Sequence, residues 1–400
     1  MTNDPDIPAS RRGVPPASGL AAVLLLLFAT GWAANHFTAM LPALRVAERL
    51  SSAVLDGAFG VYALGLLPGL LGGGGLSDRV GRRPVVLIGA TTAGSGNLIM
   101  LFTHGAAGIF VGRTVVGVGV GLAVSAGTAW AADLGGKRGT TLSGAILTIG
   151  FAAGPVVSGL LAQFLPAGPG LTVPFAVTVV LSLAVVAAAA RAGAAGGGAP
   201  VTVVARPGPD DARRGFRVAL AASVPMALWV FASVTVPMVT MVGLMADRFG
   251  GPWVPGMAAA VTLGAGVLIQ VAARRGEWGA WAGVGGAALA AVGMCVAAAA
   301  GSHPSMPMFL VCGVVLGCAY GLCLREGLVD VETLAPSGSR GMLTGIFYVF
   351  TYLGFGLPLL LVAIRPAVGV VPPLLVLAAV AAVCAAVRAV HLTATDHLRR

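Results

Sequence analysis

The residues of this 400-residue sequence most able to do chemistry are polar side chains inside long apolar segments. Arg113 stands alone in such a segment and is followed by Gly117 and Gly121. An isolated charge is costly in an apolar medium, so an arginine there indicates a substrate or ion path. The alternative is an arginine that sets topology or packs structurally.

A second polar group lies in the first apolar segment, where Asn35 and His36 are adjacent. An imidazole can titrate near neutral pH, although a neutral histidine hydrogen-bonded between helices fits equally well. Asp56, in the next segment, is the nearest plausible countercharge for Arg113. We therefore expect Asn35, His36, Asp56 and Arg113 to lie at a substrate site or on a proton path.

The second half of the chain offers fewer candidates. Glu326 follows Arg325 inside an apolar segment and is a secondary candidate for a proton carrier. Trp229, Tyr348 and Tyr352 could line an adaptable pocket for apolar ligands, because aromatic and methionine-rich surfaces suit varied partners. Ordinary helix packing is the alternative for each of them.

Enzyme signatures do not occur in the sequence. There is no phosphate-binding glycine loop, no nucleophile–base arrangement and no cluster at metal-ligand spacing, and the five cysteines all lie inside apolar runs. The sequence therefore predicts neither an enzyme nor a bound metal or cofactor.

The elements that carry these residues are apolar segments long enough to cross a bilayer. The chain is 57% hydrophobic and 10% charged, whereas soluble domains carry about 25% charged residues. A bilayer core needs roughly 20 apolar residues per helix. Twelve such segments are expected, at residues 19–43, 53–74, 84–103, 106–132, 141–164, 171–190, 217–245, 253–273, 278–300, 306–330, 341–364 and 368–390. The predicted fold class is an all-α membrane protein with twelve transmembrane helices.

The longest polar interval divides these segments into two groups of six. We expect the following domains: an N-terminal tail (1–18), an N-terminal six-helix bundle (19–190), a linker (191–216), a C-terminal six-helix bundle (217–390) and a C-terminal tail (391–400). The halves echo each other at an offset near 200, as Gly117 and Gly121 match Gly317 and Gly321. This offset indicates parallel repeats, a geometry typical of transporters that rock about a central site.

The net charge of +10 is explained by membrane topology. With both termini in the cytoplasm, Arg113 lies within a span and only Arg45, Arg49, Arg248 and Arg365 of the 24 basic residues face outward. That asymmetry follows the positive-inside rule. We expect a multi-pass protein of the cell inner membrane with no nucleic-acid partner.

The stretch from Gly74 to Arg83 is expected to be a tight cytoplasmic loop between the second and third segments. Its pattern, G-x-x-x-D-R-x-G-R-R, resembles the loop signature of the major facilitator superfamily. The resemblance implies a latch that stabilises the outward-open state, with the aspartate facing the eleventh helix and an arginine pairing with an acid at the end of the fourth. The residues of this predicted latch are Gly74, Asp78, Arg79, Gly81, Arg82, Arg83, Asp133 and Arg340.

Two further patterns resemble the same superfamily. Arg113 with its glycines is similar to a fourth-helix motif of the family, although the first span lacks the acid that antiporters of the family commonly carry there. Gly150, Gly154, Pro155 and Gly159 resemble the fifth-helix signature of the drug:proton antiporter branch. The alternative is an ordinary packing strip, a role that we also expect for Gly117 and Gly121. The offset further predicts a degenerate second latch, in which Glu332 pairs with Arg274 or Arg275.

Together these features predict a monomeric secondary transporter that exports a small hydrophobic or amphipathic compound by alternating access. Its partners would be the substrate, protons and the lipid bilayer, with the proton gradient as its energy source. Two alternatives remain open. One is a proton-coupled importer of a small metabolite, and the other is a non-transporting membrane sensor or lipid-handling protein on the same scaffold.

Overall fold

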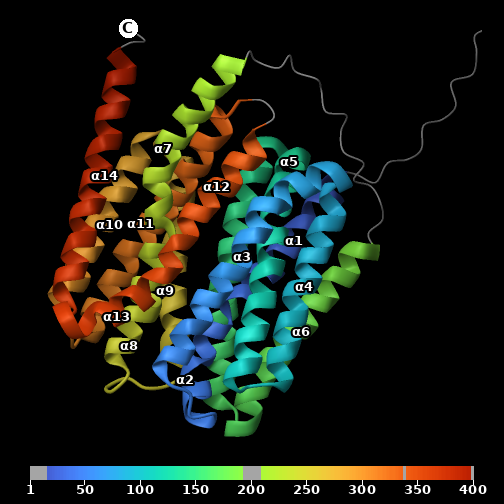
Figure 1. Cartoon of the computed structure of the whole chain (residues 1–400), viewed down its shortest axis with the longest axis vertical. Helices are drawn as coiled ribbons and strands as arrows, with labels where there is room; N and C mark the ends of the chain where they lie inside the picture. The colour runs from blue at the N-terminus through green and yellow to red at the C-terminus, as the bar shows by residue number, and fades with distance from the viewer. Residues whose placement is uncertain (1–15, 192–208, 337–338, 398–400) are drawn as a thin grey trace, which may run out of the picture.

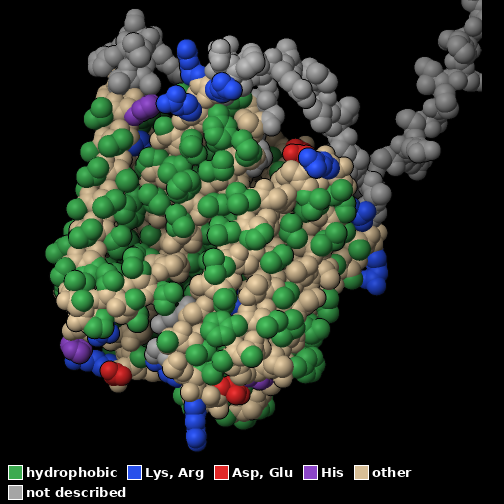
Figure 2. All heavy atoms as spheres, in the orientation of Figure 1, with side chains coloured by type: hydrophobic (Ala, Val, Ile, Leu, Met, Phe, Trp, Pro, Cys, Tyr) green, Lys and Arg blue, Asp and Glu red, His purple; other side chains and the backbone are tan. Residues whose placement is uncertain are grey.

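The computed structural model of the chain describes residues 16–191, 209–336 and 339–397, and this part of the chain is helical apart from short turns (Figure 1). Twelve of its helical stretches are long and apolar enough to cross a membrane, as the sequence predicts. Hydrophobic side chains cover the middle of the molecule and charged ones gather at its two ends (Figure 2). The protein is therefore an all-α membrane protein with twelve spans.

The first six spans form one bundle. The first span consists of two helices that meet at His36, and the fourth and fifth spans are one long helix broken at Gly136. The helices are α1 (Pro16–Asn35), α2 (Phe37–Ala47), α3 (Ser52–Val80), α4 (Arg82–Phe102), α5 (Ala106–Phe164) and α6 (Ala167–Arg191).

The last six spans form the second bundle. Two of them change helix type along their length: the seventh contains a π-helix at Val236–Met241 and the eleventh a 3₁₀ turn at Leu353–Gly356. Such breaks often mark functional segments. The helices are α7 (Pro209–Thr235), α8 (Val242–Met245), α9 (Trp253–Arg275), α10 (Trp281–Ala300), α11 (Met306–Leu334), α12 (Arg340–Tyr352), α13 (Leu357–Val368) and α14 (Val371–His397).

The predicted loop from Gly74 to Arg83 is wrong in one respect, because most of it is helix. Helix α3 continues to Val80, and the hydroxyl of Ser77 donates a 2.8 Å hydrogen bond to the Gly74 carbonyl. The chain turns only at Gly81, whose φ of 98° is a conformation that glycine adopts readily. The second span is longer than predicted because helical pairing keeps its backbone groups satisfied near the membrane.

The two bundles meet mainly along two helix pairs, α3 with α12 and α5 with α9. We call the end of the molecule that carries Arg82 and Arg274 the basic end. At the opposite end α5 and α9 approach closely, since a methyl group added to Gly159 would lie 2.6 Å from the Pro252 carbonyl oxygen. The two bundles therefore pack closely at the end opposite the basic end.

Candidate functional site

Arg113 lies in α5 and is buried among aromatic rings. Its guanidinium carbon is 4.7 Å from the centroid of the Phe37 ring, 5.7 Å from that of Phe59 and 4.1 Å from that of Tyr62. One nitrogen, Nη1, donates a 2.9 Å hydrogen bond to the Ala34 carbonyl, while Nε has no partner. Cation–π contacts and a carbonyl thus hold this charge, and within the described part of the chain no carboxylate forms an ion pair with it. The side chain of Asp56, its expected countercharge, lies outside the described residues.

His36 is fully buried and its hydrogen bonds fix which nitrogen carries the proton. Its Nε2 lies 2.7 Å from Asn97 Oδ1, and Asn97 Nδ2 donates to the carbonyls of Ala33 and Ala93. Because the amide nitrogen is already a donor, the amide oxygen must accept, so His36 Nε2 carries the hydrogen. Its Nδ1 faces the Ser158 hydroxyl at 3.5 Å. These partners all belong to the first bundle, and they suit a neutral imidazole that holds the junction of α1 and α2 against α4 and α5.

Asn35 is hydrogen-bonded to a residue that contacts the second bundle. Its Nδ2 donates a 2.7 Å hydrogen bond to the Phe151 carbonyl, and its Oδ1 accepts one from the Thr38 hydroxyl. The Phe151 ring lies edge-on to Phe231 of the second bundle, with ring centroids 6.0 Å apart. Asn35 therefore supports a residue at the boundary between the bundles.

A cluster of aromatic side chains fills the centre of that boundary. Phe231 is its hub, with ring centroids 4.6 Å from Tyr352 and 4.7 Å from Phe355. The bundles are also joined by a 2.8 Å hydrogen bond between the hydroxyls of Thr148 and Tyr320. We call this set the interface cluster: Tyr62, Phe151, Phe231, Tyr320, Tyr348, Tyr352 and Phe355.

Several polar atoms in and beside the interface cluster are buried without a hydrogen-bond partner. They are Trp229 Nε1 and Ser233 Oγ in α7, and the hydroxyls of Tyr62 and Tyr352, which lie beside each other and have no other partner. A buried polar group left unpaired costs about 1–3 kcal/mol, so these atoms would gain from a ligand that supplies a partner. The arrangement is a closed, mainly aromatic centre with a few buried polar atoms that could bind a ligand.

The sequence singled out Trp229, Tyr348 and Tyr352 but missed Phe231 and Phe355. A signal for Phe355 was present, because Tyr348, Tyr352 and Phe355 are spaced by four and three residues and so share one helix face. Phe231 carries no comparable pattern, and only its contacts show that it is the hub.

At the basic end, Arg82 contacts two acidic residues of the predicted latch. Its Nε lies 3.0 Å from Asp133 Oδ2 and its Nη1 lies 2.6 Å from Asp78 Oδ1. Arg83 donates to the carbonyls of Ala189 and Ala190 at the end of α6, where backbone acceptors are left unpaired. The arginine-to-Asp133 contact is as the resemblance implies.

The remaining latch residues differ from the implied arrangement. Asp78 pairs with Arg82 instead of the start of α12, and in the described chain none of the ion pairs joins the two bundles. Gly74 lies inside α3, Arg79 is exposed, and the side chain of Arg340 lies outside the described residues. In this structure the latch ties together helices of the first bundle only.

The predicted second latch is open. Glu332 and Arg274 line a cleft of about 260 Å³ between α5, α9 and α11 at the basic end. They form no ion pair in the described part of the chain. The boundary between α5 and α9 therefore has a cleft at the basic end, whereas Gly159 packs closely against Pro252 at the other end.

Glu326 lies away from the interface cluster, at the edge of a separate cavity inside the second bundle. It pairs with its neighbour Arg325. One turn later Asp330 pairs with Arg388 at 2.6 Å. Sequence reasoning missed Asp330 and Arg388, although the spacing of four from Glu326 places Asp330 on the same helix face.

The predicted packing glycines lie at close helix crossings. Gly117 and Gly121 face the carbonyls of Tyr62 and Leu66 in α3, and Gly150 faces that of Phe28 in α1. A methyl group on Gly154, one residue before Pro155, would lie 2.8 Å from the Trp32 carbonyl oxygen. Side chains at these positions would separate the helices that hold Arg113 and Asn35.

Twelve spans in two bundles around a closed, mainly aromatic centre define a membrane transporter fold. The chain belongs to the major facilitator superfamily, whose sequence model matches residues 23–358.

Curated relatives and solved structures agree with this assignment. Over 100 residues, 24% of each chain, the protein is 35% identical to a multidrug resistance protein MdtL of Klebsiella pneumoniae strain 342 and 34% identical to that of strain MGH 78578. The match thus spans about a quarter of the length of these relatives.

The solved structures cover almost all of the chain. The human organic anion transporter MFSD10 superposes with a TM-score of 0.68 at 17% identity, over 94% of this chain and 100% of its own. A POT family transporter has a TM-score of 0.72 at 14% identity, over 93% and 95% of the two chains. The proton:xylose symporter XylE has a TM-score of 0.72 at 13% identity, over 92% and 94%. At these identities the structures show the fold alone.

Proposed function

We propose that this protein is a proton-coupled exporter of small hydrophobic or amphipathic compounds and that it works by alternating access. The observation that carries the proposal is the interface cluster, which lies between the two bundles and buries the hydroxyls of Tyr62 and Tyr352 with no partner beyond each other. Rocking of the bundles would expose these atoms to a ligand. Aromatic walls with few polar groups suit hydrophobic and amphipathic compounds.

The direction of transport is supported by the partial similarity to MdtL, a protein named for multidrug resistance. The glycine and proline pattern from Gly150 to Gly159 adds a second reason. We place the basic end in the cytoplasm by the positive-inside rule, in the cell inner membrane, so that the cleft beside Glu332 would admit a substrate from inside the cell. The protein would act as a monomer.

The proton path is proposed to involve Asn35, His36, Asp56, Arg113 and Glu326. Arg113 supports this role because it is a buried intramembrane charge without a carboxylate partner among the described residues. The proton gradient would supply the energy, and no other cofactor is needed.

Transport by purified protein in proteoliposomes tests the proposal. A pH gradient is imposed across the vesicle membrane, and a panel of lipophilic fluorescent compounds is tested. At least one compound should move in the direction opposite to the protons, whose movement is followed with a pH dye inside the vesicles. Movement of compound and proton in the same direction would indicate an importer. An absence of compound-dependent proton flux across the whole panel would favour a sensor or lipid-handling protein and overturn the proposal.

The proposed orientation has its own test. In a cysteine-free background, a cysteine is introduced by Glu277→Cys at the basic end or by His303→Cys at the opposite end. Intact cells that carry each variant are treated with a membrane-impermeant thiol reagent. We expect labelling at position 303 only. Labelling at position 277 alone would show the opposite topology, in which the cleft faces the outside of the cell.

A further inference from the structure

The cleft between the two bundles at the basic end contains a buried amide without a partner. It has a volume of about 260 Å³ and is lined by α5, α9 and α11. Gln270 of α9 lines it and is 9% exposed, yet its Nε2 has no hydrogen-bond partner. Its Oε1 also makes no hydrogen bond within the described part of the chain. Because a buried polar group that is left unpaired costs free energy, a ligand that pairs with this amide would recover that cost.

Gln270 lies at the inner end of the cleft. One turn further from the basic end along α9, a methyl group on Gly266 would lie 2.6 Å from the Tyr320 ring, so this ring fills the space beside it. The hydroxyls of Tyr320 and Thr148 are 2.8 Å apart. Since the Thr148 hydroxyl donates to the Gly144 carbonyl, it accepts from Tyr320. The cleft therefore ends against the interface cluster.

Gly144 of α5 leaves space across the cleft from Gln270. Gly144 lines the cleft and is buried, but a methyl group on it would meet no atom within 4 Å. Gly150 of the same helix instead lies against the Phe28 carbonyl. The missing side chain at Gly144 thus makes room for a ligand and is not needed for close helix packing.

The equivalent place at the other contact between the bundles is closed. At the repeat offset of 200 the counterpart of Gln270 is Leu70 of α3, and at an offset of 201 the counterpart of Gly144 is Gly345 of α12. Leu70 is 1% exposed and belongs to the hydrophobic core, and a methyl group on Gly345 would lie 3.0 Å from its carbonyl oxygen. The framework therefore accepts a closed, apolar contact at this place, so neither the amide nor the open space at Gln270 is required for folding.

The charges of the cleft favour an uncharged ligand. Arg274 and Glu332 line the cleft with opposite signs, and Arg274 lies one turn closer to the basic end than Gln270 does. The remaining arginine of the lining, Arg325, is paired with Glu326. Since neither sign is in excess, a ligand group beside Gln270 is selected by hydrogen bonding and not by charge.

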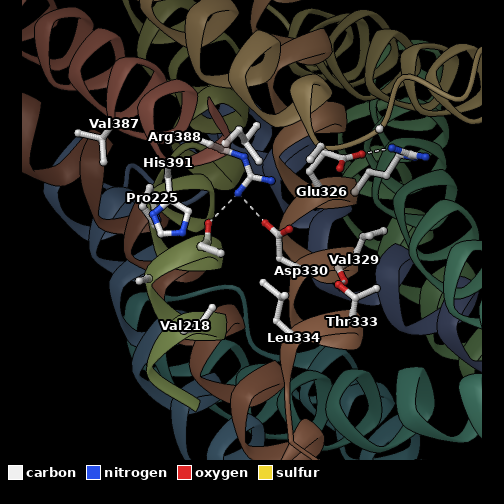
Figure 3. A pocket seen from close by; sticks show the side chains of 16 residues that line it. Val218, Pro225, Glu326, Val329, Asp330, Thr333, Leu334, Val387, Arg388 and His391 are labelled. Carbon is white, nitrogen blue, oxygen red and sulfur yellow. Dashed lines mark hydrogen bonds and ion pairs between the residues drawn. The ribbon is translucent and has the colours of Figure 1, made fainter. Parts of the chain in front are cut away.

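The larger cavity inside the second bundle differs in this respect. It measures about 400 Å³, and its two carboxylates already form ion pairs, Asp330 with Arg388 and Glu326 with the preceding arginine (Figure 3). The unpaired nitrogens of Arg388, Nε and Nη2, lie against Gly283, which does not line the cavity. The cleft is therefore the stronger candidate for a ligand site.

We propose that this cleft is the entry site for uncharged amphipathic compounds that present an N–H and a C=O side by side, as a primary carboxamide or a lactam does, and that Gln270 binds that group. The Gln270 side chain presents the same pair of groups, so two parallel hydrogen bonds form, one in each direction. A ring or chain attached to the group would lie toward Gly144, where space is open. The site rests on the proposed export function for the direction of entry, and it names the chemistry of the compounds carried.

Equilibrium binding to the purified full chain in detergent tests the site. The probe is radiolabelled para-butylbenzamide, and three unlabelled compounds of the same shape compete with it. They are para-butylacetophenone, in which a methyl group replaces the amino group, the anion para-butylbenzoate and the cation para-butylbenzamidine. We expect the benzamide to bind at least fivefold more tightly than each of them, because it alone is uncharged and offers both a donor and an acceptor.

Three variants locate the binding. Gln270→Leu keeps the volume but removes the amide, so the affinity for the benzamide should fall at least fivefold and its preference over the acetophenone should disappear. Gly144→Leu fills the open space and should weaken the binding of both compounds. The matched control is Gln163→Leu, at the only other glutamine of the chain, which lies beside Gly251 at the end opposite the basic end. It should bind the benzamide as the wild type does.

Three results would overturn the site. They are equal affinities of the four compounds, tighter binding of either charged compound, and unchanged binding of the benzamide in Gln270→Leu. If Gln270→Leu does not give a single species that melts cooperatively, Gly144→Leu decides, and unchanged binding of the benzamide in that variant overturns the site.

Transport of the benzamide in proteoliposomes separates this site from the proposed function. Binding that depends on Gln270, without proton-coupled movement of the benzamide, would contradict the export function and leave the site in place. Coupled movement at the wild-type rate in Gln270→Leu would contradict the site and leave the export function in place.

Discussion

The two bundles share a backbone framework but place their buried charges differently. In the first bundle, Arg113 is held inside the span by aromatic rings, and the ion pairs, around Arg82, lie at the basic end. In the second bundle, the ion pairs of Glu326 and Asp330 lie inside the helix bundle itself. Equivalent positions can thus be apolar core in one half and a polar cavity in the other.

What the halves keep in common is the close approach of backbones. Gly117 and Gly121 face the carbonyls of Tyr62 and Leu66, and 200 residues later Gly317 and Gly321 face those of Thr262 and Gly266. A glycine is needed at such a crossing because any side chain would push the helices apart. Helix crossings are therefore preserved between the halves, while the side chains between them are free to diverge.

The largest effect should come from the buried charge of Arg113. We expect Arg113→Ala to abolish transport in proteoliposomes while the protein still inserts and purifies. Arg113→Lys should retain little transport activity, because a compact ammonium cannot lie flat among three rings as a guanidinium does. Full activity of the alanine variant would remove Arg113 from the mechanism.

Breaking the interior ion pair of the second bundle should cost most stability. Arg388→Met leaves Asp330 buried without its partner, and we expect a loss of about 3–5 kcal/mol. Pairing it with Asp330→Leu should recover most of that loss, because no buried charge is then left alone. Denaturant unfolding in detergent measures both; equal losses in the single and double variants would contradict this account.

Substitutions at the shared glycines test what the bundles have in common. Gly117→Ala and Gly317→Ala should each destabilise the protein by about 1–3 kcal/mol, the usual cost of overpacking. Because both would place a methyl group against a carbonyl of the neighbouring helix, their effects should agree. A loss at one position only, measured by thermal unfolding, would show that the halves are not packed alike.

The smallest effect should come from the surface pair of the first bundle. Asp133→Asn removes an ion pair whose members are 52% and 24% exposed, and about 0–1 kcal/mol is expected for such pairs. The change should be reduced further at high salt, which screens exposed charges. A loss comparable to that of Arg388→Met would mean that charge placement does not distinguish the bundles.

The sequence by itself determined the spans, the repeat and the basic end. Length and hydropathy require twelve membrane helices, because apolar segments must satisfy their backbone groups internally. The contact of Arg82 with Asp133 could also be anticipated, since a family pattern fixes those residues near two helix ends. The local turn was not predicted correctly: the stretch from Gly74 to Arg83 was expected to be a loop, whereas α3 continues to Val80.

Only the tertiary structure decided which interior side chains meet. Asp330 and Arg388 lie 58 residues apart, and nothing in hydropathy brings them together. The same holds for His36 with Asn97 and for Phe231 with its aromatic neighbours. Pairing across helices depends on the rotation and tilt of each helix, which packing sets and the length of an apolar segment does not.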